Sequence, residues 1–260
     1  MEKKPEVHPV RLPAGRLHIL AFDRAPSRHL KARIIGGYSV SHHSVKYQVS
    51  LQRRGGFHYC GGSLIRRRWV LTAAHCRIRF IVVGEHSLFR REGTEQVFYP
   101  LKLISHPQYN LTTKNGDIML IKLSRMAYLN YFVGIVALPR RAAFLTPGTS
   151  CRVSGWGLTN SKGGRLPAQL RAVRVPIVDT SWCNGSQSYS GKLTRNMICA
   201  GFWSGGKDAC RGDSGGPLIC QGRLYGVVSW GNNCAEIHYP GVYTAVAKFR
   251  KWIDWTIFQS

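Results

Sequence analysis

The chain has 260 residues, a formal net charge of +25 and eight cysteines. This length allows a large hydrophobic core, and no stretch reaches the roughly 18 apolar residues of a membrane-spanning helix. The even number of widely spaced cysteines, without a Cys-x-x-Cys pair, argues against a zinc module and for disulfide bonds formed in an oxidising compartment. The chain has 37 Lys and Arg against 12 Asp and Glu. This balance favours polyanionic partners; the alternative is a solvated basic surface without a dedicated partner.

The first 33 residues are polar, rich in Pro, Arg and His, and show no periodicity. Their most apolar piece, residues 17–22, is shorter than the about 7–15 residues of a signal-peptide core and contains a histidine. The cysteines predict a secreted or granule protein, whereas this segment has no clear signal peptide. An alternative first exon or a start site placed too far upstream would reconcile the two observations.

After residue 34, short apolar runs alternate with turn residues. Examples are residues 47–51, 62–65, 101–104 and 225–229. Short strands at this spacing predict an all-β barrel or sandwich. The one persuasive helix is C-terminal, where five apolar side chains recur on one helical face. They are Val246, Phe249, Trp252, Ile253 and Ile257.

Three motifs supply an imidazole, a carboxylate and a hydroxyl. His75 ends one apolar run, Asp117 begins another, and Ser214 lies in a Gly-Asp-Ser-Gly-Gly turn. Serine is a weak nucleophile at neutral pH and needs a base. The glycines allow a tight turn that aims the N–H groups of Gly212 and Ser214 at an oxyanion. The turn alone is as compatible with an ordinary surface turn, but the three motifs together indicate acyl transfer.

In these motifs and their chain order, the sequence resembles the chymotrypsin-trypsin family of serine proteases from Ile34 to the C-terminus. The resemblance implies an all-β fold of two six-stranded antiparallel β-barrels with a C-terminal α-helix. Residues 34–139 would form the first barrel, and residues 140–260 the second barrel and the helix.

By the same resemblance, His75 is the general base, Asp117 orients it, and Ser214 attacks the peptide carbonyl. The family requires no cofactor for this chemistry. Protein and peptide substrates, and serine protease inhibitors, are the partners that the resemblance implies.

The resemblance also implies a set of substrate-binding residues: Asp208, Ala209, Ser229, Trp230, Gly231 and Gly241. Asp208 would form the base of the primary specificity pocket, where a buried carboxylate needs a cation. A substrate Arg or Lys would supply that cation. Because Ala209 has no hydroxyl to help a shorter Lys, the sequence predicts a preference for Arg, which binds the carboxylate bidentately.

Arg33, Ile34 and Asp213 match the activation residues of the family. Cleavage after Arg33 would remove residues 1–33 and free the amine of Ile34, which would then pair with Asp213. The acidic run that precedes this bond in pancreatic trypsinogens is absent. Digestive and granule proteases therefore both remain open as the nearest comparison.

The cysteine spacing does not resolve the disulfide pairing, but the family resemblance implies one. The four expected pairs are Cys60–Cys76, Cys151–Cys220, Cys183–Cys199 and Cys210–Cys234.

Two motifs outside the catalytic set concern metals. Glu85 and Glu95, with the carbonyls of Ser87 and Arg90, match the calcium-ligand spacing of trypsins. The positive charge of Arg90 and its neighbour argues against calcium, so structural calcium and an empty loop both remain open. The pair His42-His43 could bind a metal, but no third ligand is evident and surface histidines are the simpler interpretation.

Glycosylation sequons occur at Asn110 and Asn184 and are usable only in a secreted chain. The alternative to an active endopeptidase is a catalytically weak or inactive basic family member that acts by binding heparin-like polyanions or as an antimicrobial protein. Such relatives usually lack one of the three catalytic residues, and here all three are present. Specific nucleic-acid binding has no recognised motif, and no membrane span is expected.

Overall fold

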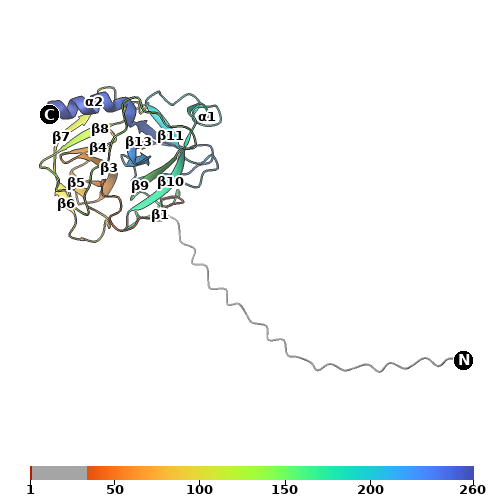
Figure 1. Ribbon diagram of the computed structural model, residues 1–260, viewed down its shortest axis with the longest axis horizontal. Helices are drawn as coiled ribbons and strands as arrows, with labels where there is room; N and C mark the ends of the chain where they lie inside the picture. The colour runs from red at the N-terminus through yellow and green to blue at the C-terminus, as the bar shows by residue number, and fades with distance from the viewer. Residues whose placement is uncertain (2–33) are drawn as a thin grey trace. The chain divides into compact units, whose positions relative to one another are not determined.

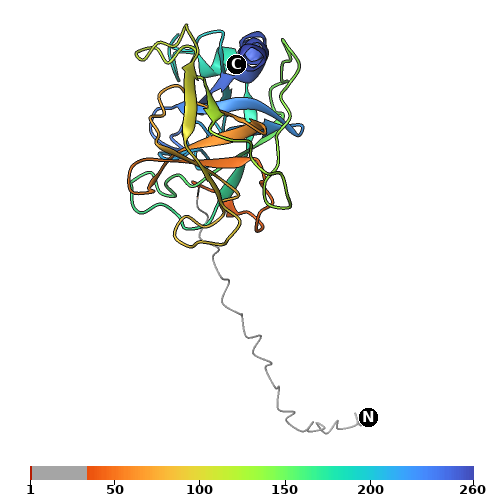
Figure 2. The same ribbon diagram turned by 90° about the vertical axis from the view of Figure 1, so that its left-hand side faces the viewer.

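The computed structural model of the protein describes residue 1 and residues 34–260. Arg33, and with it the expected pro-segment, lies outside the described residues. Within residues 34–260 the chain forms two antiparallel seven-stranded sheets, each curved into a barrel (Figures 1 and 2). Among the described residues, no helix is both long enough and apolar enough to cross a bilayer.

The first sheet has the strand order β6-β5-β2-β3-β4-β8-β7. Its strands are β2 (Gln48–Gln52), β3 (His58–Arg66), β4 (Trp69–Thr72), β5 (Phe80–Val83), β6 (Gln96–Phe98), β7 (Pro100–Ser105) and β8 (Met119–Leu123). Only Tyr99 separates β6 from β7, yet β6 pairs with β5 at one edge and β7 pairs with β8 at the other. These two strands are therefore halves of one bent strand that joins both edges and closes the barrel.

The second sheet has the order β1-β10-β11-β14-β13-β12-β9, and an additional pairing of β9 with β10 closes it. Its strands are β1 (Tyr38–Ser39), β9 (Ser150–Gly155), β10 (Arg171–Val178), β11 (Met197–Ala200), β12 (Pro217–Cys220), β13 (Arg223–Trp230) and β14 (Gly241–Ala245). Six strands form the ring, to which the two-residue β1 is added. The predicted fold of two six-stranded barrels with a C-terminal helix is confirmed.

Strand β1 lies in the second sheet, whereas the sequence-based boundaries placed residues 34–139 in the first barrel. Tyr38 pairs with Ala172 of β10 in the second sheet. The approach is close because Gly37 has no side chain: a Cβ there would lie 2.4 Å from the carbonyl oxygen of Ala172. The boundary near residue 139 otherwise stays a prediction.

The C-terminal helix α2 (Val246–Gln259) follows the second barrel in sequence but packs on the first. Phe249 and Ile253 belong to the same buried cluster as Leu64, Leu71 and Leu120 of the first barrel. Figure 1 accordingly shows α2 beside β7 and β8. The C-terminal end of the chain is therefore packed against the first barrel.

Covalent links hold both barrels in the expected manner. The four disulfides of the structure are Cys60–Cys76, Cys151–Cys220, Cys183–Cys199 and Cys210–Cys234. All eight cysteines are therefore paired as the family resemblance implied.

A single-turn helix, α1 (Thr180–Cys183), begins after Asp179, whose side chain accepts from the N–H of Ser181.

Candidate active site

The imidazole of His75 is held by the carboxylate of Asp117. His75 follows β4 and Asp117 precedes β8, and because these strands pair antiparallel, both residues lie at the same end of the first barrel. Nδ1 of His75 lies 2.8 Å from Oδ2 of Asp117, and the backbone N–H of His75 donates to Oδ1 at 3.0 Å. Since a carboxylate only accepts, Nδ1 is the donor, and in the neutral form of the ring Nε2 is an acceptor for another partner.

The second barrel completes the surroundings of this carboxylate. The hydroxyl of Ser229 in β13 donates to Oδ2 of Asp117 at 2.5 Å, and the hydroxyl of Thr244 in β14 donates to the main-chain oxygen of Asp117 at 2.8 Å. Asp117 is fully buried. A carboxylate of the first barrel is thus fixed partly by the second, which couples the orientation of His75 to the docking of the two barrels.

Ser214 lies on a tight turn that is pressed against the first barrel. The N–H of Gly61 in β3 donates to the carbonyl oxygen of Ser214 at 2.8 Å. Gly215 has a φ of +79°, and a Cβ there would lie 2.1 Å from the hydroxyl oxygen of Thr72 in β4. Only glycine allows this approach, which brings the serine turn against the strand that leads to His75.

Asp213, beside this serine, is fully buried and accepts two backbone hydrogen bonds. Its Oδ1 accepts from the N–H of Gly157 at 2.7 Å, and its Oδ2 from the N–H of Cys210 at 2.9 Å. Burial raises the pKa of Asp213 to about 6. Among residues 34–260 no cationic side chain forms an ion pair with it.

His58 was missed by the sequence reasoning, although it contacts the serine turn. Its Nε2 lies 2.9 Å from the carbonyl oxygen of Gly212, and its Nδ1 lies 2.9 Å from the hydroxyl of Ser50. Burial lowers the pKa of His58 to about 4, so the ring is neutral at pH 7 and donates through Nε2 to the carbonyl. A histidine within a strand carries no local signal for such a role.

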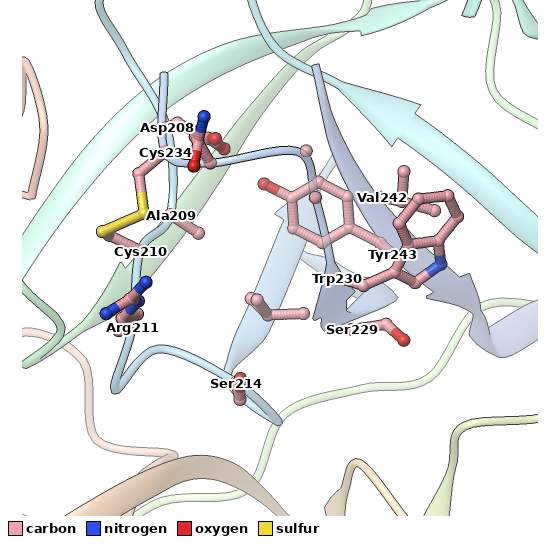
Figure 3. A pocket seen from close by; sticks show the side chains of 14 residues that line it. Asp208, Ala209, Cys210, Arg211, Ser214, Ser229, Trp230, Cys234, Val242 and Tyr243 are labelled. Carbon is pink, nitrogen blue, oxygen red and sulfur yellow. A yellow bond between two sulfur atoms is a disulfide. The ribbon is translucent and has the colours of Figure 1, made fainter. Parts of the chain in front are cut away.

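One cavity of about 250 Å³ connects the serine turn to Asp208. Figure 3 shows Asp208 and Ala209 on one wall, Trp230 and Tyr243 across from them, and Ser214 nearby. All six residues predicted to bind substrate line this cavity: Asp208, Ala209, Ser229, Trp230, Gly231 and Gly241. The structure therefore brings together the predicted nucleophile and the predicted specificity residues.

Asp208 is a buried carboxylate with one oxygen unpartnered. Oδ2 accepts from the N–H of Ala235 at 3.0 Å, whereas Oδ1 has no hydrogen-bond partner and the residue is 4% exposed. Burial raises the pKa of Asp208 to about 7. A Cβ on Gly241 would lie 2.7 Å from Oδ1, so this glycine keeps the approach to the free oxygen open.

The segment that begins at Ile34 packs against the pocket. The side chain of Ile34 is fully buried in the core of the second barrel, with a φ of +46°. The carbonyl oxygen of Ile35 accepts from the N–H of Asp208 at 3.2 Å. The residue expected to become the new N-terminus therefore lies close to Asp208 and its cavity.

The expected calcium loop contains a third carboxylate that the sequence reasoning missed. Oxygens of Glu85, Glu92 and Glu95 lie within 4.8 Å of one another. Burial, and then the neighbouring Glu95 and Glu92, raise the pKa of Glu85 to about 7, and its Oε1 has no partner. Three converging carboxylates, one of which has an oxygen without a partner, fit an oxygen-binding cation, and Ser87 and Arg90 lie in the same loop.

The basic surface is only partly free for partners. Within the run of three arginines at residues 66–68, Arg68 donates to the carbonyl oxygens of Leu123 and Ser124, so its side chain binds the main chain. By contrast, four arginines line one shallow surface pocket of about 390 Å³ together with Ile78: Arg53, Arg54, Arg77 and Arg79. Arg77, one of these four arginines, is two residues after His75 in the sequence.

Comparison with known proteins agrees with these features. The family model described as Trypsin matches residues 34–253. Over 228 residues, 86% of this chain, it is 50% identical to Trypsin-3 of Salmo salar, 49% to Trypsin of Sus scrofa and 49% to Serine protease 1 of Homo sapiens. The matches cover 93%, 96% and 90% of those proteins. The chain therefore belongs to the trypsin family of chymotrypsin-like serine proteases and is a serine endopeptidase.

Proposed function

We propose that this endopeptidase cleaves peptide bonds after Arg, and less readily after Lys. One observation carries the proposal: the cavity lined by Ser214 ends at Asp208, a buried carboxylate with one unpartnered oxygen. A buried carboxylate in a shaped cavity is stabilised by a cation with matching donors, and a guanidinium offers two parallel N–H groups. Lys reaches less far, and Ala209 supplies no hydroxyl to assist it.

In the proposed mechanism His75, Asp117 and Ser214 act as a unit. Nε2 of His75 takes the proton of the Ser214 hydroxyl as its oxygen attacks the substrate carbonyl. Asp117 stabilises the imidazolium that forms. His75 then gives the proton to the leaving amine, and a water molecule repeats the sequence to release the acid and regenerate the serine.

The backbone of the serine turn stabilises the charge of the intermediate. The N–H groups of Gly212 and Ser214 donate to the oxyanion of the tetrahedral intermediate. This role is supported by the φ of +100° at Gly212 and by the bond from His58 to its carbonyl oxygen. The carbonyl oxygen of Arg211 accepts from the N–H of Leu158 at 2.8 Å, and because it shares a peptide unit with the Gly212 N–H, this bond directs that N–H to the opposite side.

The strand segment from Ser229 to Gly231 binds the substrate chain. Its main chain pairs with the substrate backbone, and Trp230 forms an apolar wall of the pocket. Gly231 leaves room for a long side chain, since the nearest atom to a Cβ there would be 3.5 Å away.

We further propose that the protein is made as a zymogen. Cleavage between Arg33 and Ile34 removes residues 1–33 and frees an ammonium group that pairs with Asp213. Two observations support this step: Asp213 is buried without a cation among the described residues, and Ile34 is already fully buried in the second barrel. An ammonium paired with a buried carboxylate offsets the cost of burying each charge.

The loop of residues 85–95 is proposed to bind calcium as a structural ion. Glu85 and Glu95 supply carboxylate oxygens, Ser87 and Arg90 supply carbonyl oxygens, and Glu92 lies among them. When bound, calcium neutralises carboxylates that otherwise repel one another.

Secretion, or storage in a granule, is proposed from the four disulfides and the relation to trypsins. Protein inhibitors of serine proteases are the expected regulators. A second binding function, for heparin-like polyanions, is favoured by the four-arginine pocket. Retention on heparin to higher salt than on a plain cation exchanger would support it; equal elution would leave only nonspecific charge.

The decisive experiment is hydrolysis of matched chromogenic Arg and Lys substrates before and after cleavage at Arg33. Activity should appear on cleavage, with Arg preferred, and the active chain should begin at Ile34. Arg33→Gln should block this gain. A chain that binds heparin but never hydrolyses either substrate would instead be a catalytically weak or inactive binding protein.

A further inference from the structure

Three histidines and one glutamate meet beside the carboxylate loop. His42 and His43 precede β2, His86 follows β5, and Glu92 lies between β5 and β6. One ligand atom each of His42, His43 and Glu92 lies within 4.8 Å of the other two. The ring centroid of His86 is 4.3 Å from that of His42 and 5.7 Å from that of His43. The tertiary fold thus supplies the additional ligands that the His42-His43 pair lacks in the sequence.

Two of these imidazoles have buried nitrogens without partners. His43 is 6% exposed and its Nε2 has no hydrogen-bond partner; His86 is 2% exposed and its Nδ1 has none. A buried polar atom without a partner costs free energy, and such atoms are rare in folded proteins. A metal ion bound between them would accept a lone pair from each neutral imidazole.

Glu92 is already oriented toward the histidines. Its Oε1 lies 2.6 Å from Nε2 of His42, while its Oε2 accepts from the backbone N–H of Ser87 at 3.0 Å. A carboxylate held by a backbone donor keeps one oxygen directed at the imidazoles, which is the arrangement by which outer hydrogen bonds position metal ligands.

We propose that His42, His43, His86 and Glu92 bind a divalent ion of the zinc type. Imidazole nitrogens and one carboxylate oxygen are ligands that suit zinc, at about 2.0–2.2 Å each. Ligands in such a tetrahedron are about 3.3 Å apart, and the ligand atoms of His42, His43 and Glu92 already lie within 4.8 Å of one another. With four protein ligands the ion is structural, and it connects the segment before β2 to the loop before β6.

This site differs in chemistry from the proposed calcium loop, but the two share Glu92, so the zinc titration is made without calcium. Calcium takes oxygen ligands, whereas three of the four ligands here are nitrogens. It also differs from the grouping of His75 with Cys60 and Cys76, because those two sulfurs form a disulfide.

The test is zinc titration of the chelator-treated full chain by calorimetry, in calcium-free buffer. We expect one tight site per chain and a zinc-dependent rise in Tm, because the ion binds only the folded state. His42→Gln, a change at an exposed position, and His43→Gln should each weaken zinc binding by about 100-fold or more, at least as much as the loss of an outer-shell partner.

His106→Gln is the matched control, since this half-buried histidine packs on Phe249 and Trp252 outside the cluster. It should keep the tight site, as should His75→Gln. Zinc affinity in the His42 and His43 variants equal to that of the parent chain, or loss of binding in His75→Gln, would overturn the proposal. Hydrolysis of an Arg substrate by His42→Gln after activation, measured without zinc, verifies that the variant is folded.

Discussion

Asp117 and Asp208 are both buried carboxylates, 0% and 4% exposed, but their hydrogen bonding differs. Both oxygens of Asp117 accept hydrogen bonds from the protein, from the backbone and ring of His75 and from Ser229. In Asp208, Oδ2 accepts a hydrogen bond from the N–H of Ala235, whereas Oδ1 has no hydrogen-bond partner. The protein itself supplies hydrogen bonds to both oxygens of Asp117, whereas in the proposed function the substrate supplies those to Oδ1 of Asp208.

The difference separates two uses of buried charge. A carboxylate whose partners are all part of the protein fixes the geometry of a neighbouring group, here the imidazole of His75. A buried carboxylate that lacks a hydrogen-bond partner costs free energy, and a cation that enters its cavity offsets this cost. Substitutions should therefore affect turnover near Asp117 and substrate choice near Asp208.

The largest expected effect is on the unit that Asp117 supports. Ser214→Ala and His75→Ala should each lower kcat by about 10⁶, because each removes an essential member of one catalytic unit. Single-turnover and steady-state assays on an Arg substrate measure this loss. If Ser214→Ala kept more than about a tenth of kcat, the proposed mechanism would be wrong, since a triad effect is far larger.

Asp117→Asn should lower kcat by about 10⁴, as this change does in Ser-His-Asp triads. An amide can donate to Nδ1 of His75, which then holds the wrong tautomer for a general base. The fold should persist, because Ser229 and the backbone of His75 can still bond the amide. A rise in KM as large as the fall in kcat would contradict a role confined to turnover.

Asp208→Asn should lower kcat/KM for Arg substrates by about 10²–10⁴, because the guanidinium then loses its charged partner in a desolvated pocket. The loss should be much smaller for a substrate with an uncharged side chain before the scissile bond. A uniform loss across both substrates would indicate misfolding of the pocket in place of lost recognition.

Binding of a small guanidinium such as methylguanidine should weaken as pH falls below about 7. The pKa of Asp208 is raised to about 7 in the empty pocket, and only the ionised carboxylate attracts the cation. Binding therefore releases a proton below this pH, and the affinity should fall by about tenfold per pH unit. Calorimetry across pH 5–8, with Asp208→Asn as control, measures it; a flat profile in the parent protein would contradict the assignment.

The smallest expected effect is that of Ser229→Ala, about tenfold in kcat. This change removes one neutral-donor hydrogen bond to Asp117 and leaves the bonds from His75 intact. The pH dependence of kcat/KM should shift, which a purely structural role would not cause. A loss as large as that of Asp117→Asn would mean that Ser229 orients the imidazole directly.

The sequence alone determined much of this architecture. Alternating short apolar runs predicted an all-β barrel fold, and the spacing of Phe249 and Ile253 predicted the C-terminal helix, because burial on one face leaves a periodic trace in the chain. The Gly-Asp-Ser-Gly-Gly turn and the positions of His75 and Asp117 indicated acyl transfer before any fold was known. The four disulfide pairs required the family resemblance, since spacing alone leaves the pairing open.

Tertiary structure decided what depends on contacts between distant segments. It placed β1 in the second sheet, packed α2 on the first barrel, and brought His58 onto the carbonyl of Gly212. It added Glu92 to the carboxylates of the loop and to the His42-His43 pair. None of these has a local signal, because a side chain's partners across a barrel are set by strand register and by which buried polar atoms remain unpaired once the core has formed.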